Sequence, residues 1–481
     1  MKTWVLIKRF LPYFKNYRRL FVLDLLCAAL TTLCEIVLPL IVRFITNTAI
    51  SDASQLTAEA ILRCGFLYII LRIIDSAAAY FMTSMGHYAG AAVETEMRRD
   101  LFAHLQQLSF SYFSHTKVGQ IMARITSDLF EITEFAHHCP EEFLIAAIKG
   151  VVSFVIIARV NLWLALVIFA ALPVMLVVAS HFNHKMRAGM KDSRQQVGEI
   201  NAQVEDSLLG IRVVKSFTNE AYEEHKFAQG NQVFLKMKKQ IYRAMAGLTC
   251  TTRSFDGLMY ILVVMLGGFL LMDGKITPGD FVLALLYVSM LLTTVRRLVD
   301  YAEQFQKGTT GIERFFEIMD APFEIKDSPD AKELTDVQGD IKFEHVSFHY
   351  PDEPETEVLQ DISLHIRPGD NVALVGPSGA GKTTLCNLIP RFYEATGGRI
   401  LVDDRDIRSL TLKSLRSNIG MVQQDVYLFA GSVAENIIYG KPGATMEEVV
   451  EAAKKANAHD FIMELPQGYE TYIGERGVRL S

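Results

Sequence analysis

The sequence predicts an all-α domain of six membrane-spanning helices, followed by a smaller α/β domain. Three observations lead to this prediction. Half of the 481 residues are hydrophobic, and they gather in long, nearly uncharged stretches of the length that crosses a bilayer core of about 30 Å. The composition changes after Asp320. Strand-like segments and a glycine-rich loop come after that point.

The charge distribution excludes a nucleic-acid-binding protein. The formal net charge is −6, and residues 340–481 carry 14 Lys and Arg against 21 Asp and Glu. Neither part of the chain is therefore basic, as a nucleic-acid partner would require. The six cysteines show no Cys-x-x-Cys or metal-ligand spacing, so a disulfide framework is not expected, and a reducing or intramembrane setting is favoured.

Six stretches within residues 1–320 are predicted to cross the membrane. The fourth is the clearest, because it is uncharged and interrupted only by a proline. The last two are also uncharged and the third has one lysine, whereas the first two contain acidic and basic residues. In chain order they are Leu20–Phe44, Ala60–Ala92, Phe143–Ala158, Leu162–Ala179, Gly257–Met272 and Phe281–Val295.

Basic residues flank these stretches on one side. The first nineteen residues carry six Lys and Arg and no acid, whereas the connection Ile45–Glu59 has no Lys or Arg. The positive-inside rule then places both termini in the cytoplasm and the protein in the cell membrane. Residues 3–17 are predicted to form an amphipathic helix on the inner surface. A cleaved signal peptide is the alternative, but no small-residue cleavage site follows an apolar core there.

Two cytoplasmic connections are long and rich in helix-forming residues. Residues 93–140 and 181–248 are predicted to be helices that continue beyond the membrane, with short breaks at Ser109–Gly119 and Leu209–Thr218. Solvated loops are the alternative, although structureless loops of this length are uncommon. A helix pair with a turn at its tip could contact a soluble domain.

Ionisable residues inside a membrane are costly and often face a cavity. Glu35 lies deep in the first predicted span, four residues before Pro39. Three interpretations stay open: contact with a cationic substrate or a proton, a bond to a neighbouring helix, or a position nearer the membrane edge. Arg72 and Asp75 are three residues apart in the second span, so they are predicted to pair with each other.

A polar linker with two prolines, residues 321–340, leads to the second domain, residues 341–481. Strand-forming residues there predict three strands before the glycine-rich loop. They are Ile341–His349, Val358–Ile366 and Asn371–Val375.

The third strand leads directly into GPSGAGKT, which matches GxxxxGK[ST], the phosphate-binding P-loop. Glycines let backbone N–H groups turn inward around phosphate oxygens, where a Cβ would obstruct them. Lys382 is predicted to reach the β- and γ-phosphates, and the Thr383 hydroxyl to hold Mg²⁺. The predicted cofactors are ATP and Mg²⁺; an exposed lysine in a glycine-rich turn is the alternative. The predicted ATP-binding residues here are Gly376, Ser378, Gly379, Ala380, Gly381, Lys382, Thr383 and Thr384.

With these motifs in place, the whole layout resembles the exporter class of ATP-binding cassette (ABC) transporters, a six-helix membrane half followed by one nucleotide-binding domain. The resemblance implies that Tyr350, in VSFHYP, stacks on adenine. It also implies that Gln424, in MVQQD, is the Q-loop glutamine and a ligand of Mg²⁺. Tyr472–Gly477 resembles the segment before the family signature, in which Glu475 is expected to contact the protruding helices.

The family signature would read LSGGQ, and the sequence stops at Leu480-Ser481. In the family, the glutamate that polarises the attacking water and the histidine that supports it follow the signature. We therefore expect residues 1–481 to be a fragment of a longer protein with an incomplete core sheet. This fragment is expected to contain no catalytic residue and to bind ATP without hydrolysing it.

The resemblance implies an ATP-dependent exporter subunit that pairs with a second transporter half, as a homodimer or a heterodimer. Its substrate would be an amphipathic, drug-like or lipid-like compound, moved across the cytoplasmic membrane. The alternative is a non-hydrolysing, nucleotide-binding regulatory or degenerate partner of another transporter half.

Overall fold

The computed structural model describes residues 3–51, 55–422 and 427–473. The chain divides into two units. The first extends to Leu108 and continues from Tyr112 to Phe323, and the second combines Ser109–Ser111 with the chain from Glu324 onward. Three residues from the middle of the helical region therefore group with the C-terminal part.

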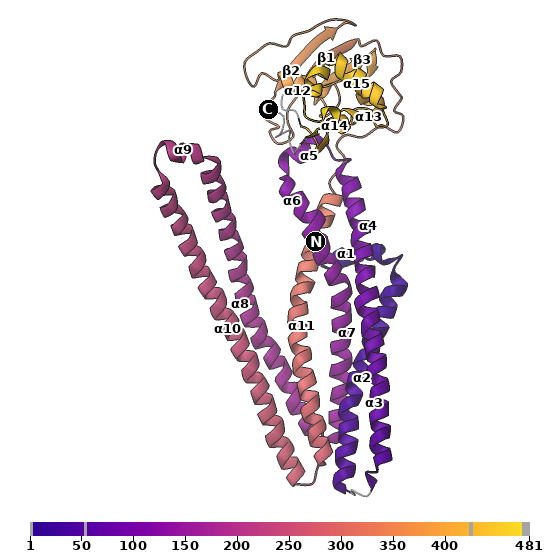
Figure 1. Ribbon diagram of the computed structural model, residues 1–481, viewed down its shortest axis with the longest axis vertical. Coiled ribbons are helices and arrows are strands. Elements are labelled where there is room, and N and C mark those ends of the chain that lie inside the picture. The colour runs from indigo at the N-terminus through magenta and orange to yellow at the C-terminus, as the bar shows by residue number, and fades with distance from the viewer. Residues whose placement is uncertain (1–2, 52–54, 423–426, 474–481) are drawn as a thin grey trace. The chain divides into compact units, whose positions relative to one another are not determined.

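Long helices make up the first unit (Figure 1). Two π-helical segments, Met82–Gly86 and Arg124–Asp128, interrupt them, and a 3₁₀ turn, Leu11–Phe14, follows the first helix. The helices are α1 (Thr3–Phe10), α2 (Arg18–Ser51), α3 (Ala58–Phe81), α4 (His87–Leu105), α5 (Phe110–His115), α6 (Val118–Ala123), α7 (Leu129–Val160), α8 (Leu162–Leu209), α9 (Ile211–Ser216), α10 (Glu220–Met272) and α11 (Pro278–Met319).

Side-chain caps fix where several of these helices begin. The Asn161 side chain accepts a hydrogen bond from the backbone N–H of Leu164, so α8 starts with only Asn161 between it and the end of α7. Thr277 and Asp280 form a reciprocal capping box at the start of α11, with Pro278 in the first turn. Each such cap satisfies N–H groups that have no partner within the helix.

Five helical segments of the described chain are long and apolar enough to cross a bilayer. They are α2, the continuous run from α6 to α7, α8, α10 and α11. The second predicted span, Ala60–Ala92, covers most of α3, the π-helical segment after it and the start of α4, and α3, a helix of 24 residues, is not among these five. The molecule is therefore a multi-pass membrane protein, and its sixth crossing stays a prediction.

The two breaks predicted in the long connections are confirmed. Helix α8 ends at Leu209, and the short helix α9 separates it from α10. Helices α8 and α10 pack along each other, and Figure 1 shows α9 at the tip of this pair. Gly247 permits the close packing, because a Cβ there would lie 2.6 Å from Cε1 of Phe182. The other break contains the end of α4, α5 and the start of α6.

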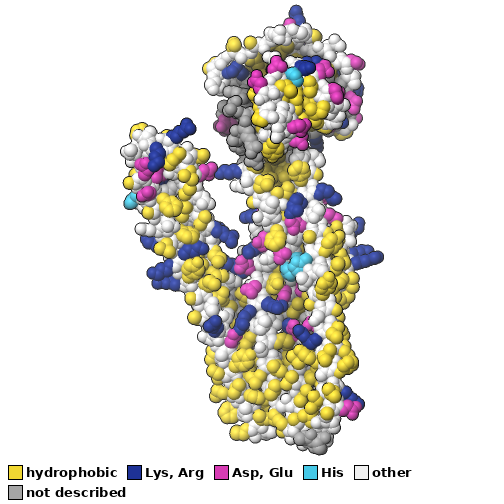
Figure 2. Space-filling model, in the orientation of Figure 1, with side chains coloured by type: hydrophobic (Ala, Val, Ile, Leu, Met, Phe, Trp, Pro, Cys, Tyr) yellow, Lys and Arg dark blue, Asp and Glu magenta, His cyan; other side chains and the backbone are white. Residues whose placement is uncertain are grey.

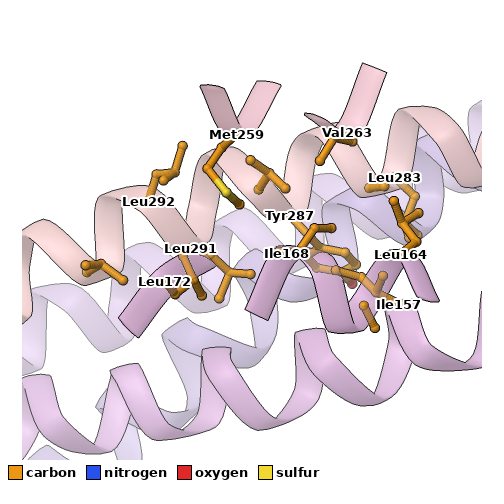
Figure 3. Packing of buried hydrophobic residues seen from close by; sticks show 14 of the residues in the cluster. Ile157, Leu164, Ile168, Leu172, Met259, Val263, Leu283, Tyr287, Leu291 and Leu292 are labelled. Carbon is orange, nitrogen blue, oxygen red and sulfur yellow. The ribbon is translucent and has the colours of Figure 1, made fainter. Parts of the chain in front are cut away.

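A hydrophobic core joins α7, α8, α10 and α11. Figure 3 shows buried side chains of these helices meeting around Tyr287, including Leu164, Ile168 and Met259. The Tyr287 hydroxyl donates a hydrogen bond to the carbonyl oxygen of Ile36 at 2.9 Å, so its polar end is satisfied within the core.

The second unit is built on an antiparallel sheet in the order β2-β1-β3-β4. Strands β1 and β2 confirm the predictions for 341–349 and 358–366, each to within one residue. A separate two-stranded ladder, β5 with β6, lies among short helices. The elements are β1 (Ile341–Phe348), β2 (Leu359–Ile366), α12 (Lys382–Leu388), β3 (Gly397–Val402), β4 (Arg405–Asp406), α13 (Leu412–Ser417), β5 (Gly431–Ser432), α14 (Val433–Ile438), α15 (Met446–Lys455), α16 (His459–Met463) and β6 (Tyr472–Ile473).

The strand predicted at Asn371–Val375 is wrong. The structure assigns no strand there, and the side chains of Val372 and Val375 are 48% and 90% exposed. A strand of this apolar kind is stable when it pairs on its edges and is covered on both faces. None of the described strands pairs with this segment.

Candidate nucleotide site and membrane cavity

The glycine-rich loop lies between the exposed segment 371–375 and helix α12. Gly379 and Gly381 have φ angles of +83° and +77°, which only glycine adopts without strain. A Cβ at Gly381 would also lie 2.7 Å from Cδ2 of Leu359 and 3.1 Å from the carbonyl oxygen of Val358. Glycine at 381 therefore allows both the turn and its close approach to β2.

The ammonium group of Lys382 lies over the loop. Its Nζ donates hydrogen bonds to the carbonyl oxygens of Gly376, at 2.9 Å, and Pro377, at 2.7 Å. The lysine therefore lies against the loop that the motif offers to phosphate. Because the side chain is flexible and carries three donors, a phosphate oxygen could replace either carbonyl as its partner.

The structure brings Tyr350 to the loop, although 34 residues separate it from Thr384. The hydroxyl groups of Tyr350 and Thr384 share a hydrogen bond of 2.9 Å. The Tyr350 ring contacts Phe348 and Tyr393 edge-on, with centroids 5.0 Å and 5.3 Å away. Sequence reasoning identified Tyr350 by resemblance but missed Tyr393, because nothing in its local sequence relates it to β1.

Arg416 holds the chain that follows α12. Arg416 donates hydrogen bonds to the carbonyl oxygens of Pro390, at 2.9 Å, and Arg391, at 2.8 Å. Burial lowers the pKa of Arg416 from its ordinary value, and the neighbouring Arg391 lowers it further. Because arginine titrates so high, Arg416 stays charged at neutral pH and continues to donate these bonds.

Residues Ser109–Ser111 belong to the second unit, where Phe110 contacts the aromatic rings near Tyr350. The Phe110 ring stacks on Phe392, with centroids 6.1 Å apart and an interplanar angle of 21°, and its distance to the Tyr393 ring is also 6.1 Å. The Ser109 hydroxyl donates a 2.6 Å hydrogen bond to Glu324. Within the second unit, Phe110 therefore contacts Tyr393, the residue that also supports Tyr350.

Some predicted residues cannot be placed. Gln424 and Glu475 lie outside the described residues. Thr383 is exposed in the first turn of α12, so its role and that of Gln424 as ligands of Mg²⁺ stay predictions.

A cavity of about 340 Å³ opens among the helices of the first unit. This volume lies within the range of small-molecule sites. Its lining mixes apolar residues with charged and polar ones, among them Glu35, Tyr68, Arg72, Glu142, Lys149 and Arg297.

Charged groups in the cavity wall are paired. The Glu35 carboxylate lies 2.5 Å from Nζ of Lys149, an ion pair that links α2 to α7. The bond to a neighbouring helix, one of the three interpretations of Glu35, is therefore present. The predicted pair of Arg72 with Asp75 is confirmed at 2.8 Å, and Glu142 pairs with Arg297 at 3.2 Å.

Two family models match the chain. The model of the ABC transporter transmembrane region matches residues 21–295, more than half of the chain. The model described as ABC transporter matches residues 359–481, which include the glycine-rich loop and Lys382.

Curated relatives cover nearly the whole chain. An uncharacterised ABC transporter ATP-binding protein of Bacillus subtilis strain 168, YwjA, is 38% identical over 99% of this chain and 82% of its own length. A candidate multidrug export ATP-binding/permease protein of the same organism, YgaD, is 30% identical over the same shares. An ATP-dependent lipid A-core flippase of Syntrophus aciditrophicus strain SB is 33% identical over 91% of this chain and 72% of its own length.

Proposed function

The chain belongs to the family of ABC transporters, with the fused membrane and nucleotide-binding regions of an exporter half-transporter, and we propose that it exports an amphipathic, drug-like or lipid-like compound. The observation that carries the proposal is the membrane cavity with its paired charges and apolar walls. Such a lining suits a molecule with one polar and one apolar end. The names of relatives, which refer to multidrug export and to lipid A-core flipping, agree with this class of substrate.

ATP binds at the glycine-rich loop in this proposal. The backbone N–H groups of residues 376–381 surround the phosphates, and Lys382 donates to the β- and γ-phosphates. The Tyr350 ring stacks on adenine, while Thr383 and Gln424 hold Mg²⁺. The positive φ of Gly379 and the hydrogen bonds from Lys382 to the loop carbonyls support this assignment. When bound, Mg²⁺-ATP supplies the free energy that drives the conformational change of the membrane region during transport.

A second transporter half completes the assembly, as a homodimer or a heterodimer. The tip of the pair formed by α8 and α10 supports this part of the proposal, because it exposes Leu208, Leu209 and Phe217. Exposed apolar groups clustered at one site are typical of an interaction surface. Both chain ends lie in the cytoplasm in this arrangement, in keeping with the basic flanks.

For residues 1–481 taken alone, we propose nucleotide binding without hydrolysis. The resemblance places water activation in motifs other than the glycine-rich loop. A non-hydrolysing regulatory or degenerate partner subunit is the second candidate. ATPase activity of the full-length protein above background would favour the exporter, whereas full-length protein that binds ATP but never hydrolyses it would favour the partner.

Transport in proteoliposomes tests the proposal. Full-length protein would be reconstituted with a fluorescent lipid analogue or with an amphipathic cationic dye, and movement would be followed with and without Mg²⁺-ATP. We expect ATP-dependent movement of one of the two probes, abolished in Lys382→Ala. Equal movement in the wild type and in Lys382→Ala, or no movement of either probe, would contradict the proposal.

A further inference from the structure

Three histidines from two helices converge in the first unit. Their ligating nitrogens, from His87 of α4 and His137 and His138 of α7, lie within 4.8 Å of one another. The ring centroids are 4.8 Å apart for His87 and His137 and 5.1 Å apart for His87 and His138. Figure 2 shows a cyan histidine patch on this unit, with magenta carboxylates near it.

The convergence is unusual for neighbours on one helix. Consecutive helical residues point in directions about 100° apart, yet the rings of His137 and His138 have centroids only 3.9 Å apart. His87 directly follows the π-helical segment Met82–Gly86. Such segments realign the side chains that follow them and are frequent at functional sites. One turn later, Gly90 leaves room for His137, because a Cβ there would lie 3.2 Å from its Nδ1.

His137 is oriented as a metal ligand would be. Its Nδ1 lies 2.7 Å from the carbonyl oxygen of Thr133, and since a carbonyl only accepts, Nδ1 carries the proton and donates. The other nitrogen, Nε2, then carries a lone pair when the ring is neutral. The side chain is only 4% exposed, and Nε2 has no hydrogen-bond partner among the described residues. Metal-bound histidines are commonly fixed by such a hydrogen bond from the second nitrogen.

Carboxylates surround the group. Oxygens of Glu134 and Glu141 lie 3.6 Å and 3.8 Å from the two ring nitrogens of His138. Asp24 of α2 is buried beside Gly86, and its Oδ1 has no hydrogen-bond partner within the part of the chain that the structure describes. A negative surrounding stabilises a bound cation, and either glutamate could supply a fourth ligand.

We propose that His87, His137 and His138 bind one divalent transition-metal ion of the zinc class and thereby tie α4 to α7. Imidazole nitrogen suits zinc, nickel and copper, whereas calcium and magnesium prefer oxygen ligands. Tetrahedral zinc with Zn–N distances of about 2.0–2.1 Å places its nitrogens about 3.3 Å from one another. Ring rotations of the exposed His87 and the half-buried His138 toward His137 close the remaining gap.

Metal titration of the purified full-length protein tests this site. The protein would carry an affinity tag without histidine and be stripped with EDTA. Zn²⁺ would be titrated calorimetrically, and Co²⁺ would be followed by its visible absorption, which reports tetrahedral nitrogen ligation. His184→Ala, an exposed histidine of α8 outside the group, is the matched control. His87→Ala is the informative variant, because His87 is exposed and its loss leaves the helix packing intact.

We expect one equivalent of Zn²⁺ per chain in the wild type and in His184→Ala, with an increase in melting temperature on binding. Removing a ligand should weaken binding more than the roughly 10- to 100-fold typical of losing an outer-shell partner. His87→Ala and His138→Ala should therefore bind at least about 100-fold more weakly and show no thermal shift with metal. Stoichiometric binding that survives in His87→Ala, or no binding by the wild type, would overturn the proposal.

Discussion

Glu35 and Lys149 form an ion pair that joins α2 to α7 in the wall of the membrane cavity, with 2.5 Å between Oε2 and Nζ. Lys149 is buried, whereas Glu35 is about half exposed. The pair therefore fixes two membrane helices to each other, while part of the Glu35 carboxylate remains accessible from the cavity. A group that does both can influence stability and substrate selection at once.

Breaking this pair should destabilise the protein. Glu35→Gln would leave the buried Lys149 ammonium without its counter-charge. Because Glu35 is about half exposed, the expected cost lies between the roughly 1 kcal/mol of an exposed pair and the roughly 3–5 kcal/mol of a buried one. The double variant Glu35→Gln, Lys149→Met should recover most of that loss, because no buried charge remains. Melting temperature in detergent measures both changes. Glu59→Gln, which breaks the exposed pair with Arg63, is the control and should cost less than about 1 kcal/mol.

The same variants test the role of Glu35 in selectivity. In the transport assay, the double variant should favour neutral over cationic probes relative to the wild type. Unchanged stability in Glu35→Gln would show that the ion pair does not stabilise the protein. Unchanged selectivity in the double variant would show that Glu35 does not contact the substrate.

The attachment of α1 should depend on pH. The guanidinium of Arg9 donates two hydrogen bonds to the Asp320 carboxylate, at 2.7 Å and 2.6 Å, and lies 4.0 Å from the centre of the Phe316 ring. The hydrogen bond from Arg9 lowers the pKa of Asp320 below its usual value. The stabilisation is therefore complete above the unfolded-state pKa, near 4, and is lost as pH falls through the lower folded pKa.

Hydrogen exchange of residues 3–10 measures this effect. We expect faster exchange of α1 below about pH 4, after correction for the intrinsic rate, and faster exchange already at pH 7 in Asp320→Asn. The pair is partly exposed, so its contribution is about 0.2–1 kcal/mol. If Asp320→Asn kept the wild-type pH dependence, another group would have to hold α1.

Gly381 should tolerate no side chain. Gly381→Ala requires a left-handed conformation, costing about 1–2 kcal/mol, and also places a Cβ 2.7 Å from Leu359. Gly369→Ala is a matched control, because Gly369 has φ +83° and nothing within 4 Å of its ideal Cβ. Denaturant unfolding should show a larger decrease in the free energy of unfolding for Gly381→Ala than for Gly369→Ala. Equal decreases would mean that the contact between residue 381 and β2 has room for a Cβ.

Two substitutions separate the roles of Tyr350. Tyr350→Phe removes the hydrogen bond to Thr384 and keeps the ring, so ATP affinity should change little if the ring stacks on adenine. Tyr350→Ala removes the ring, and loss of base stacking worth about 1–3 kcal/mol should weaken ATP binding by about 5- to 150-fold. If both variants bound ATP with wild-type affinity, the Tyr350 ring would contribute only to packing of the hydrophobic core.

The parts of the fold that could be predicted from the sequence depend on local patterns. The breaks at 109–119 and 209–218, the first two strands and the glycine-rich loop all follow from composition and spacing within short windows. The segment 371–375 could not be predicted correctly, because whether a strand forms there depends on partners remote in sequence. The pairing of Glu35 with Lys149 and the convergence of His87 with His137 depend on helix packing, which no local pattern records.

Binding of Mg²⁺-ATP by the purified protein tests the central claim, that the glycine-rich loop holds the triphosphate. The affinity of a fluorescent ATP analogue would be compared for the wild type, Lys382→Ala and the control Lys413→Ala, an exposed lysine in α13. Losing a charge-assisted hydrogen bond worth about 1.5–3 kcal/mol predicts binding weakened at least about 10-fold in Lys382→Ala and unchanged in Lys413→Ala. Wild-type affinity in Lys382→Ala, or no nucleotide binding by the wild type, would contradict the account.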